Sequence, residues 1–496
     1  MVFIDGTVVN IALPVIQTDL HANAIDMQWV VNAYSLFLAA LMLVGGSLGD
    51  HYGRRLMFVI GTLVFAASSA WCGFAPDVHH LIAARGVQGV GSALMTPESL
   101  AIISACFEGA ARGRAIGLWS SFSALTTALG PALGGFIVQY ASWRWVFFIN
   151  IPFAIGVLAS VAAGVPESRD TEREHHLDWV GSALATLGLG GITYGLITAG
   201  ETGLRDPWVA GSIIGGIAIL IAFVVYEGRA KNPMMPLWLF KSPTFSGSNL
   251  LTFLLYAALS GAIFFVPFDL IQARHYPPSA AGVSILPFVI LMVTLSPWAG
   301  GLVANYGSKL PLVVGPTIAA IGFALFAITS SVANYWESIF LSFLVTGLGM
   351  AVTVAPLTTT VLESADEGHV GLASAINNAI SRAAGLFAVA ALSLVVIDVF
   401  GSRLSASIAA MPVAPDVRAH ISAQMAPQRT QLAAAQPPRD LSAPLHAELA
   451  DDIIKSYVAG FRVAMLIAAG LALCSALIAL FFIPARPGKT DVARPT

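Results

Sequence analysis

The sequence predicts an all-α membrane protein, and two observations lead to that prediction. Hydrophobic residues make up 57% of the 496 residues, charged residues only 10%, and the mean hydropathy is +0.79. A soluble domain carries roughly 25% charged residues, so this much apolar surface must face lipid rather than water. Apolar stretches of about 20 residues, enough to cross a bilayer as a helix, also follow one another along nearly the whole chain.

Fourteen stretches have the length and composition of transmembrane helices. They cover residues 1–18, 27–49, 55–74, 79–106, 113–138, 144–165, 179–199, 208–227, 245–268, 281–303, 310–329, 337–361, 370–399 and 457–483. The first begins at Met1 without a polar flank, so we expect the natural start to lie upstream.

The order of these stretches predicts two halves of six helices with two additional helices between them. The predicted divisions are 1–165 for the first half, 166–243 for the two additional helices, 244–483 for the second half and 484–496 for a cytoplasmic tail. The second half includes a partly helical external loop over 400–456.

Lys and Arg predict the topology, because basic residues are retained on the cytoplasmic side of a membrane. Thirteen of them fall in one set of alternate loops and the tail, against three in the other set when 400–456 is left aside. Both termini are therefore predicted to be cytoplasmic.

A repeated loop supports the division into halves. The segment GSLGDHYGRRL, which begins at Gly46, aligns with GGLVANYGSKL, which begins at Gly300, and five of eleven positions are identical. Gly53 in the first copy allows a tight turn. Asp50 and Arg54 have uncharged counterparts in the second copy, so the charged chemistry is concentrated in the first half.

The charges of the first copy have two interpretations. Asp50 can pair with Arg54, or with Arg112 and Arg114 of the next cytoplasmic loop, and such a pair would act as a latch that closes the cytoplasmic side. Ordinary positive-inside anchoring is the alternative, and by itself it would explain Arg54 and Arg55.

The segment LGPALGG, residues 129–135, predicts a bend and a close helix contact. Pro131 removes a backbone donor, and Gly130, Gly134 and Gly135 are small enough for neighbouring helices to approach closely. A bend that seals against its neighbour hinders leak and suits exchange, although a passive packing seam would need the same residues.

Ionisable residues inside the predicted spans are costly and indicate function. Asp5 lies 13 residues before the external loop, or about 20 Å of helix, which is near mid-depth. Arg85 approaches the same level from outside. Burial favours a neutral carboxyl and a neighbouring arginine favours the carboxylate, so a pair that opens and closes can exchange a proton. A purely structural pair is the alternative.

Two further ionisable residues lie in these spans. Glu98 follows Pro97 toward the cytoplasmic side, where it would bind a proton or a cationic substrate, or would simply be solvated at the interface. Arg382, beside Asn377 and Asn378, is interpreted as a structural hydrogen-bonding centre or a substrate contact. Further substrate-binding candidates rest on position only. They are Trp29, Asn32, Tyr34, Phe122 and Asn249.

Five segments together resemble a known family, the major facilitator superfamily, and within it the fourteen-span drug:proton antiporters of the EmrB/QacA type. They are IDGTVVNIALP at 4–14, GSLGDHYGRR at 46–55, RGVQGVG at 85–91, LGPALGG at 129–135 and WRWVFFINIP at 143–152. The resemblance implies the major facilitator fold, proton-coupled efflux of small molecules without a cofactor, and a bacterial inner-membrane location. A periplasmic adaptor protein is a partner that the sequence leaves open.

Several other functions are disfavoured. The net charge of −3 without a basic cluster gives no nucleic-acid footprint. All ten histidines fall in loops or at span ends, which disfavours an intramembrane metal site. Gly488–Lys489–Thr490 lacks the earlier glycine of an ATP-binding loop, because position 483 is Ile. The open alternatives are a proton-coupled transporter of a specific metabolite and an intramembrane enzyme acting on lipids.

Overall fold

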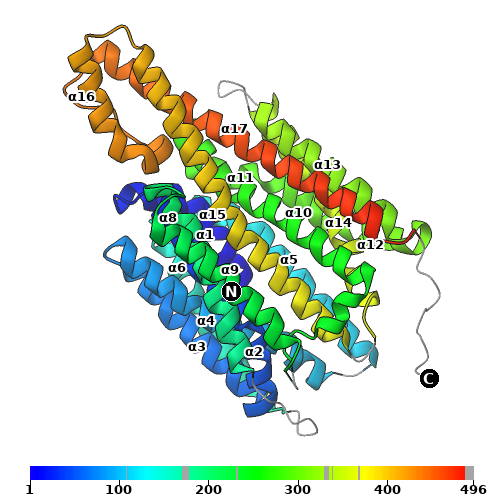
Figure 1. Ribbon diagram of the computed structural model, residues 1–496. Coiled ribbons are helices and arrows are strands. Elements are labelled where there is room, and N and C mark those ends of the chain that lie inside the picture. Colours follow the sequence, from blue (N-terminus) through cyan, green and yellow to red (C-terminus); the bar gives the residue numbers. More distant parts are fainter. Residues whose placement is uncertain are drawn as a thin grey trace. The chain divides into compact units, whose positions relative to one another are not determined.

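The computed structural model describes residues 1–107, 109–169, 178–230, 233–328, 335–337, 339–366 and 369–485. Every regular element within these ranges is helical (Figure 1), which confirms the all-α prediction. The predicted tail 484–496 lies outside the described residues from position 486 onward.

The helices follow one another with short connections. Up to residue 227 they are α1 (Val2–Asp19), α2 (Ala24–Tyr52), α3 (Arg54–Phe74), α4 (Val78–Cys106), α5 (Gly109–Tyr140), α6 (Trp145–Phe148), α7 (Asn150–Gly164), α8 (Trp179–Thr202) and α9 (Pro207–Glu227). Beyond it they are η1 (Leu237–Lys241), α10 (Pro243–Phe268), η2 (Asp269–Ala273), α11 (Pro278–Ser284), α12 (Leu286–Tyr306), α13 (Lys309–Ile328), η3 (Tyr335–Glu337), α14 (Ile339–Glu363), α15 (Val370–Ala410), α16 (Pro415–Met425), η5 (Ala426–Ala434) and α17 (Ala443–Phe482).

A helix lies over each of the fourteen predicted spans, and twelve helices of the described chain are long and apolar enough to cross a membrane. The helices α1 and α5 are not among the twelve. Helix α1 has only 18 residues and carries Asp5 and Asp19, whereas α5 is rich in glycine, serine and threonine. The multi-pass prediction is confirmed, and the count of fourteen stays a prediction.

Contacts divide the chain into two compact units. The first combines Met1–Met234 with Gly261–Val283 and Leu386–Ala464, and the second combines Met235–Ser260 with Ser284–Gly385 and the chain from Met465 on. These units do not follow the predicted division into 1–165, 166–243 and 244–483. They differ because the end of α10, nearly all of α11 and the whole 400–456 segment group with the N-terminal helices, as does the chain from 166 to 234. The division into halves stays a prediction.

Within the first unit, glycines let helices approach closely. A Cβ atom added to Gly91 of α4 would lie 2.6 Å from the Phe65 nitrogen and 2.9 Å from the Gly61 oxygen of α3. On the other side of α4, Gly45 of α2 meets the Ala93 backbone. Small residues of this kind hold helices together in lipid, where the hydrophobic effect does not drive one helix against another.

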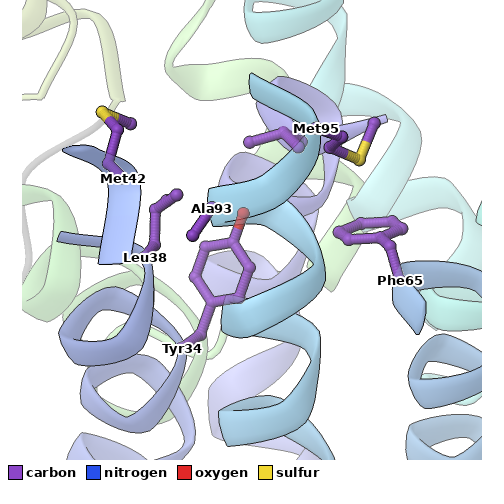
Figure 2. Close-up of a cluster of buried hydrophobic side chains, with 7 residues drawn as sticks. Tyr34, Leu38, Met42, Phe65, Ala93 and Met95 are labelled. Atoms are coloured by element: carbon purple, nitrogen blue, oxygen red, sulfur yellow. The ribbon is translucent and has the colours of Figure 1, made fainter. Parts of the chain in front are cut away.

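A buried apolar cluster fills the space beside these contacts (Figure 2). Tyr34, Leu38 and Met42 of α2 recur every four residues and meet Phe65 of α3 and Met95 of α4. The spacing of four residues places the three α2 side chains on one helix face. This cluster fixes α2, α3 and α4 as one packed group.

The segment 400–456 is helical over most of its length. It contains the end of α15, all of α16 and η5, and the start of α17. Helices α15 and α17 have 41 and 40 residues, or about 60 Å each, roughly twice the thickness of a hydrocarbon core. Both helices therefore extend beyond a bilayer, as the prediction of a partly helical external segment requires.

The two copies of the repeated loop share a backbone feature. Gly53 ends α2 with a φ of +122°, and Gly307 ends α12 with a φ of +75°. Residues with side chains rarely adopt such angles. The turn that the sequence repeat predicts is thus built around a glycine in each copy.

We expect Gly91→Val to reduce thermal stability, because the added atoms would push α3 away from α4. Overpacking of this kind costs roughly 1–3 kcal/mol. The matched control is Gly211→Val on α9, where an added Cβ meets nothing within 4 Å. Unfolding of both purified variants in detergent, followed by tryptophan fluorescence, checks the difference. Equal melting temperatures for the two would contradict the close approach.

Candidate functional site

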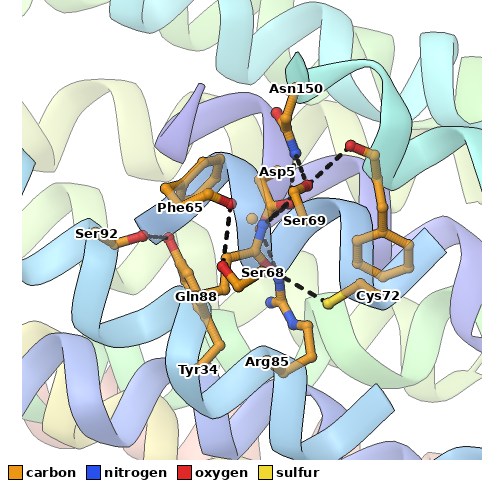
Figure 3. A network of polar contacts seen from close by, with 12 residues as sticks. Asp5, Tyr34, Phe65, Ser68, Ser69, Cys72, Arg85, Gln88, Ser92 and Asn150 are labelled. Atoms are coloured by element: carbon orange, nitrogen blue, oxygen red, sulfur yellow. Dashed lines mark hydrogen bonds and ion pairs between the residues drawn. The ribbon is translucent and has the colours of Figure 1, made fainter. Parts of the chain in front are cut away.

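The centre of the candidate site is a buried ion pair between α1 and α4 (Figure 3). The Arg85 Nη1 atom donates to Asp5 Oδ2 at 2.6 Å, and the two side chains are 2% and 0% exposed. These residues are 80 positions apart in the chain. The sequence predicted from helix depth that they would meet, and the structure brings them together.

Two amides complete the surroundings of the Asp5 carboxyl group. The Gln88 Nε2 atom and the Asn150 Nδ2 atom each donate to Asp5 Oδ1 at 3.0 Å. Both oxygens of Asp5 are therefore hydrogen-bonded, as a buried carboxylate requires. Neither amide was predicted as a site residue, although Gln88 lies one turn after Arg85 in RGVQGVG and Asn150 lies in WRWVFFINIP.

Ser69 of α3 links the two amides to each other. Its Oγ accepts from Gln88 Nε2 at 3.3 Å and from Asn150 Nδ2 at 3.0 Å, and it donates to the Phe147 carbonyl at 2.8 Å. The network thus joins α1, α3, α4, α6 and α7. Ser69 can reach this network because the close contact of Gly61 with Gly91 holds α3 against α4.

The Arg85 guanidinium is held from several sides. It donates to the Val30 carbonyl from Nε at 3.1 Å and to Gln88 Oε1 from Nη1 at 2.7 Å. It also lies 4.3 Å from the centre of the Tyr34 ring, a cation–π arrangement. Tyr34, predicted as a substrate contact, is therefore part of the surroundings of the ion pair. These contacts fix the charge of Arg85 beside Asp5.

A second acid on α4 lies in a different environment. Glu98 is 1% exposed, and neither of its carboxyl oxygens has a hydrogen-bond partner among the described residues. It lies against Gly49 of α2, where a Cβ atom would collide with the carboxyl group. Such an acid is stable when it carries a proton, because a buried carboxylate without donors loses its hydration without replacement. The structure does not place Glu98 in the Asp5 network.

The charged loop between α2 and α3 forms a local ion pair. Arg54 donates from Nε and Nη2 to Asp50 Oδ1 at 2.9 and 2.7 Å. Of the partners predicted for Asp50, this is the one that the structure forms, and Arg112 and Arg114 of α5 are exposed. The Asp50 and Arg54 side chains are themselves 29% and 21% exposed.

Glu167, which was not among the predicted site residues, caps α3. Its carboxyl oxygens accept from the backbone amides of Arg55 at 3.0 Å and Leu56 at 3.1 Å. A negative group there satisfies free amides and the positive end of the helix dipole. Gly53 makes room, because a Cβ atom on it would lie 2.7 Å from the Glu167 carboxyl carbon. In the sequence, the sign of such a cap is that Gly53, the residue before α3, has no side chain with which to cap the helix itself.

The LGPALGG segment packs closely on two sides, as predicted. Gly130 meets Thr7 of α1, and Gly134 meets the Val8 backbone of α1. On the other side Gly135 meets the Pro278 backbone of α11. A fourth contact joins the Pro131 carbonyl to Gly282, also on α11. The close helix contact is therefore present, and the bend at Pro131 stays a prediction.

The remaining substrate-binding candidates are scattered over the two units. In the first unit, Trp29 lies 6.2 Å from the Tyr194 ring of α8, Asn32 is buried, and Phe122 of α5 is 64% exposed. In the second unit, Asn249 accepts from Asn377 at 3.1 Å, and Arg382 is half-buried on α15. Their role in substrate binding stays a prediction.

The chain is similar in sequence to known membrane transport proteins over most of its length. A family model described as Major Facilitator Superfamily matches residues 1–389. The tetracenomycin C resistance and export protein of Streptomyces glaucescens is 31% identical over 495 residues, covering 99% of this chain and 90% of that protein. A puromycin resistance protein of Streptomyces alboniger is 33% identical over 401 residues, covering 80% of this chain and 79% of that protein.

A solved structure has the same fold. A bacterial homologue of the human lysosomal transporter Spinster, in an inward-facing and occupied conformation, is similar with a TM-score of 0.64 at 14% sequence identity. The match covers 96% of this chain and 93% of that chain.

We expect Arg85→Leu to destabilise the protein by about 3–5 kcal/mol, because it leaves the Asp5 carboxylate buried without its cation. Adding Asp5→Asn to Arg85→Leu removes the orphaned charge and should recover part of the loss. Thermal unfolding of the two single variants and the double variant forms a double-mutant cycle. Strictly additive effects would contradict an energetic pairing of these two side chains.

Proposed function

Because the chain belongs to the Major Facilitator Superfamily, we propose that it exports amphiphilic or cationic small molecules across the bacterial inner membrane in exchange for protons. The family and its fold are those of transporters rather than enzymes. The relatives named for tetracenomycin C export and puromycin resistance support drug export over uptake of a specific metabolite. Both termini are cytoplasmic in this proposal, and a periplasmic adaptor is not required by it.

The observation that carries the proposal is the buried pair of Asp5 and Arg85. A carboxylate removed from water must be paired with a cation or carry a proton. The 2.6 Å contact supports the paired state as one end of a cycle. The other end is a protonated Asp5 that has separated from Arg85. An exchanger needs two such states. The carboxylate is stable only beside Arg85, and Asp5 away from Arg85 is stable only when it carries a proton.

The proposed cycle follows from these two states. In the outward-facing conformation Asp5 takes a proton from outside. On the inward side, a bound cationic substrate or the return of Arg85 favours the carboxylate and releases the proton. Rocking of the two halves around a cavity near the middle of the membrane would expose the site alternately. Glu98 is the competing candidate for the coupling proton.

Two further parts serve as gates in this proposal. The Asp50–Arg54 pair, with Gly53 and the Glu167 cap, holds the end of α2 and the start of α3 on the predicted cytoplasmic side. The contacts of Gly130 and Gly134 with α1, and of Gly135 with α11, seal the neighbourhood of α5 against leak.

Asp5→Asn should abolish uphill transport while leaving substrate binding and passive equilibration. Asparagine keeps the shape of the side chain but cannot exchange a proton. The assay is substrate movement into proteoliposomes with an imposed pH gradient, using a panel of amphiphilic compounds. Glu98→Gln is the matched comparison, because it neutralises a second buried acid, on the helix that carries Arg85. Uphill transport by Asp5→Asn and its loss in Glu98→Gln would assign the coupling to Glu98.

Asp50→Asn should reach the membrane at normal levels but transport several-fold more slowly. The substitution keeps the shape and removes the charge-assisted bond to Arg54, which is worth about 1 kcal/mol or less at this exposure. Transport rates at matched protein amounts check the expectation. A normal rate would leave Arg54 and Arg55 with an anchoring role only.

A further inference from the structure

We propose that a groove in the first unit binds an anionic phospholipid of the predicted inner leaflet, with one acyl chain inside the groove and the head group at Arg112. The groove lies among α3, α4, α5 and α7 and has a volume of about 530 Å³. That volume is within the range of small-molecule pockets, roughly 300–1,000 Å³. The proposal concerns lipid and does not depend on proton exchange.

The lining of the groove suits a hydrocarbon chain. Phe58 of α3, Ile102 of α4 and Val157 of α7 contribute apolar walls, and Trp119 of α5 forms another side. The Phe3 ring of α1 packs edge-to-face against that indole, with the ring centres 6.0 Å apart. An apolar chain fits such walls without leaving polar groups unpaired.

The mouth of the groove opens on the exposed face of α7. Phe153 is 50% exposed, and Gly156 and Ser160 are exposed beside it. A Cβ atom on Gly156 would meet nothing within 4 Å, so this glycine leaves the opening wide. Helix α7 belongs to one of the apolar candidate spans. The medium that meets an exposed apolar face in a span is lipid.

The position of the groove along the helices indicates the leaflet. Phe58 lies four residues after the start of α3, Ile103 three residues before the end of α4, and Val165 directly after α7. All three ends belong to the side predicted as cytoplasmic. The groove is thus at the depth of the inner leaflet, within reach of its head groups.

Charge toward the predicted cytoplasmic end of the groove favours an anionic head group. Arg112 precedes Trp119 by seven residues, which places it on the same face of α5 about 10 Å nearer the predicted cytoplasmic end. It is exposed. Glu167, two residues beyond Val165, is engaged by the amides of Arg55 and Leu56. A basic side chain near the membrane surface favours an anionic lipid by roughly fivefold.

The test uses brominated phospholipids, whose acyl chains quench a tryptophan on contact. The full-length protein is reconstituted in phosphatidylcholine bilayers with increasing amounts of brominated phosphatidylglycerol or brominated phosphatidylcholine. Subtracting the signal of Trp119→Phe isolates the fluorescence of Trp119. We expect the brominated phosphatidylglycerol to quench Trp119 at a roughly fivefold lower mole fraction than brominated phosphatidylcholine. Arg112→Gln should bring the two lipids to equal quenching.

Two matched variants separate the groove from the surrounding lipid. Gly156→Phe fills the groove and should remove the preference and most of the quenching of Trp119. Gly211→Phe makes the same change on α9, also with nothing within 4 Å of the new Cβ and outside the lining of the groove, and should leave both intact. If thermal unfolding shows that Gly156→Phe is destabilised, Gly156→Leu replaces it. Equal quenching by the two lipids in the native protein, or unchanged quenching in the filled variant, overturns the proposal.

Discussion

A carboxylate in the middle of a membrane protein must find donors and a positive charge inside the protein. Asp5 meets that requirement with Arg85 from α4, Gln88 from the same helix and Asn150 from α7. Ser69 of α3 then joins the two amides. The need to satisfy one acid therefore fixes the mutual positions of four helices. Any movement of α1 against α4 has to supply the acid with a proton or with other donors.

Close helix contacts make this network possible. Side chains of serine, asparagine and glutamine are short, so the helices that carry them must lie near one another before hydrogen bonds form. Gly61 and Gly91 bring the α3 and α4 backbones together, and Ser69 and Gln88 lie further along the same two helices. In lipid, where apolar side chains gain little from meeting each other, small residues and buried polar contacts share the task of holding helices together.

The parts of the fold that depend on hydropathy and length are readable from the sequence. The apolar stretches predicted the helices because each must cross lipid, and helix depth predicted that Asp5 and Arg85 would meet. The rotation of each helix about its axis is harder to predict. Helix α2 is apolar on most sides, so nothing in its pattern indicated that Trp29 would contact Tyr194 of α8.

The supporting residues of the site escaped prediction for a related reason. An amide such as Asn150 can bond to many partners, and its sequence position does not say which helix it will face. Glu167 lies more than a hundred positions from the amides that it caps, beyond any local capping pattern. Long-range polar contacts of this kind appear only when the helices are placed in space.

The two glycine turns, at Gly53 and Gly307, distinguish the backbone conformation of a turn from the charges that accompany it. At both Gly53 and Gly307 the chain turns through a glycine with positive φ. The pair of opposite charges accompanies only the first turn, since Ala304 and Ser308 stand where Asp50 and Arg54 do, whereas Lys309 retains the basic character of Arg55. The glycine turn thus forms with or without the acid–base pair beside it. An acid at position 304 and a base at position 308 would give the second turn the same pair of charges as the first, so a sequence with matching charges at both turns is two substitutions from the present one.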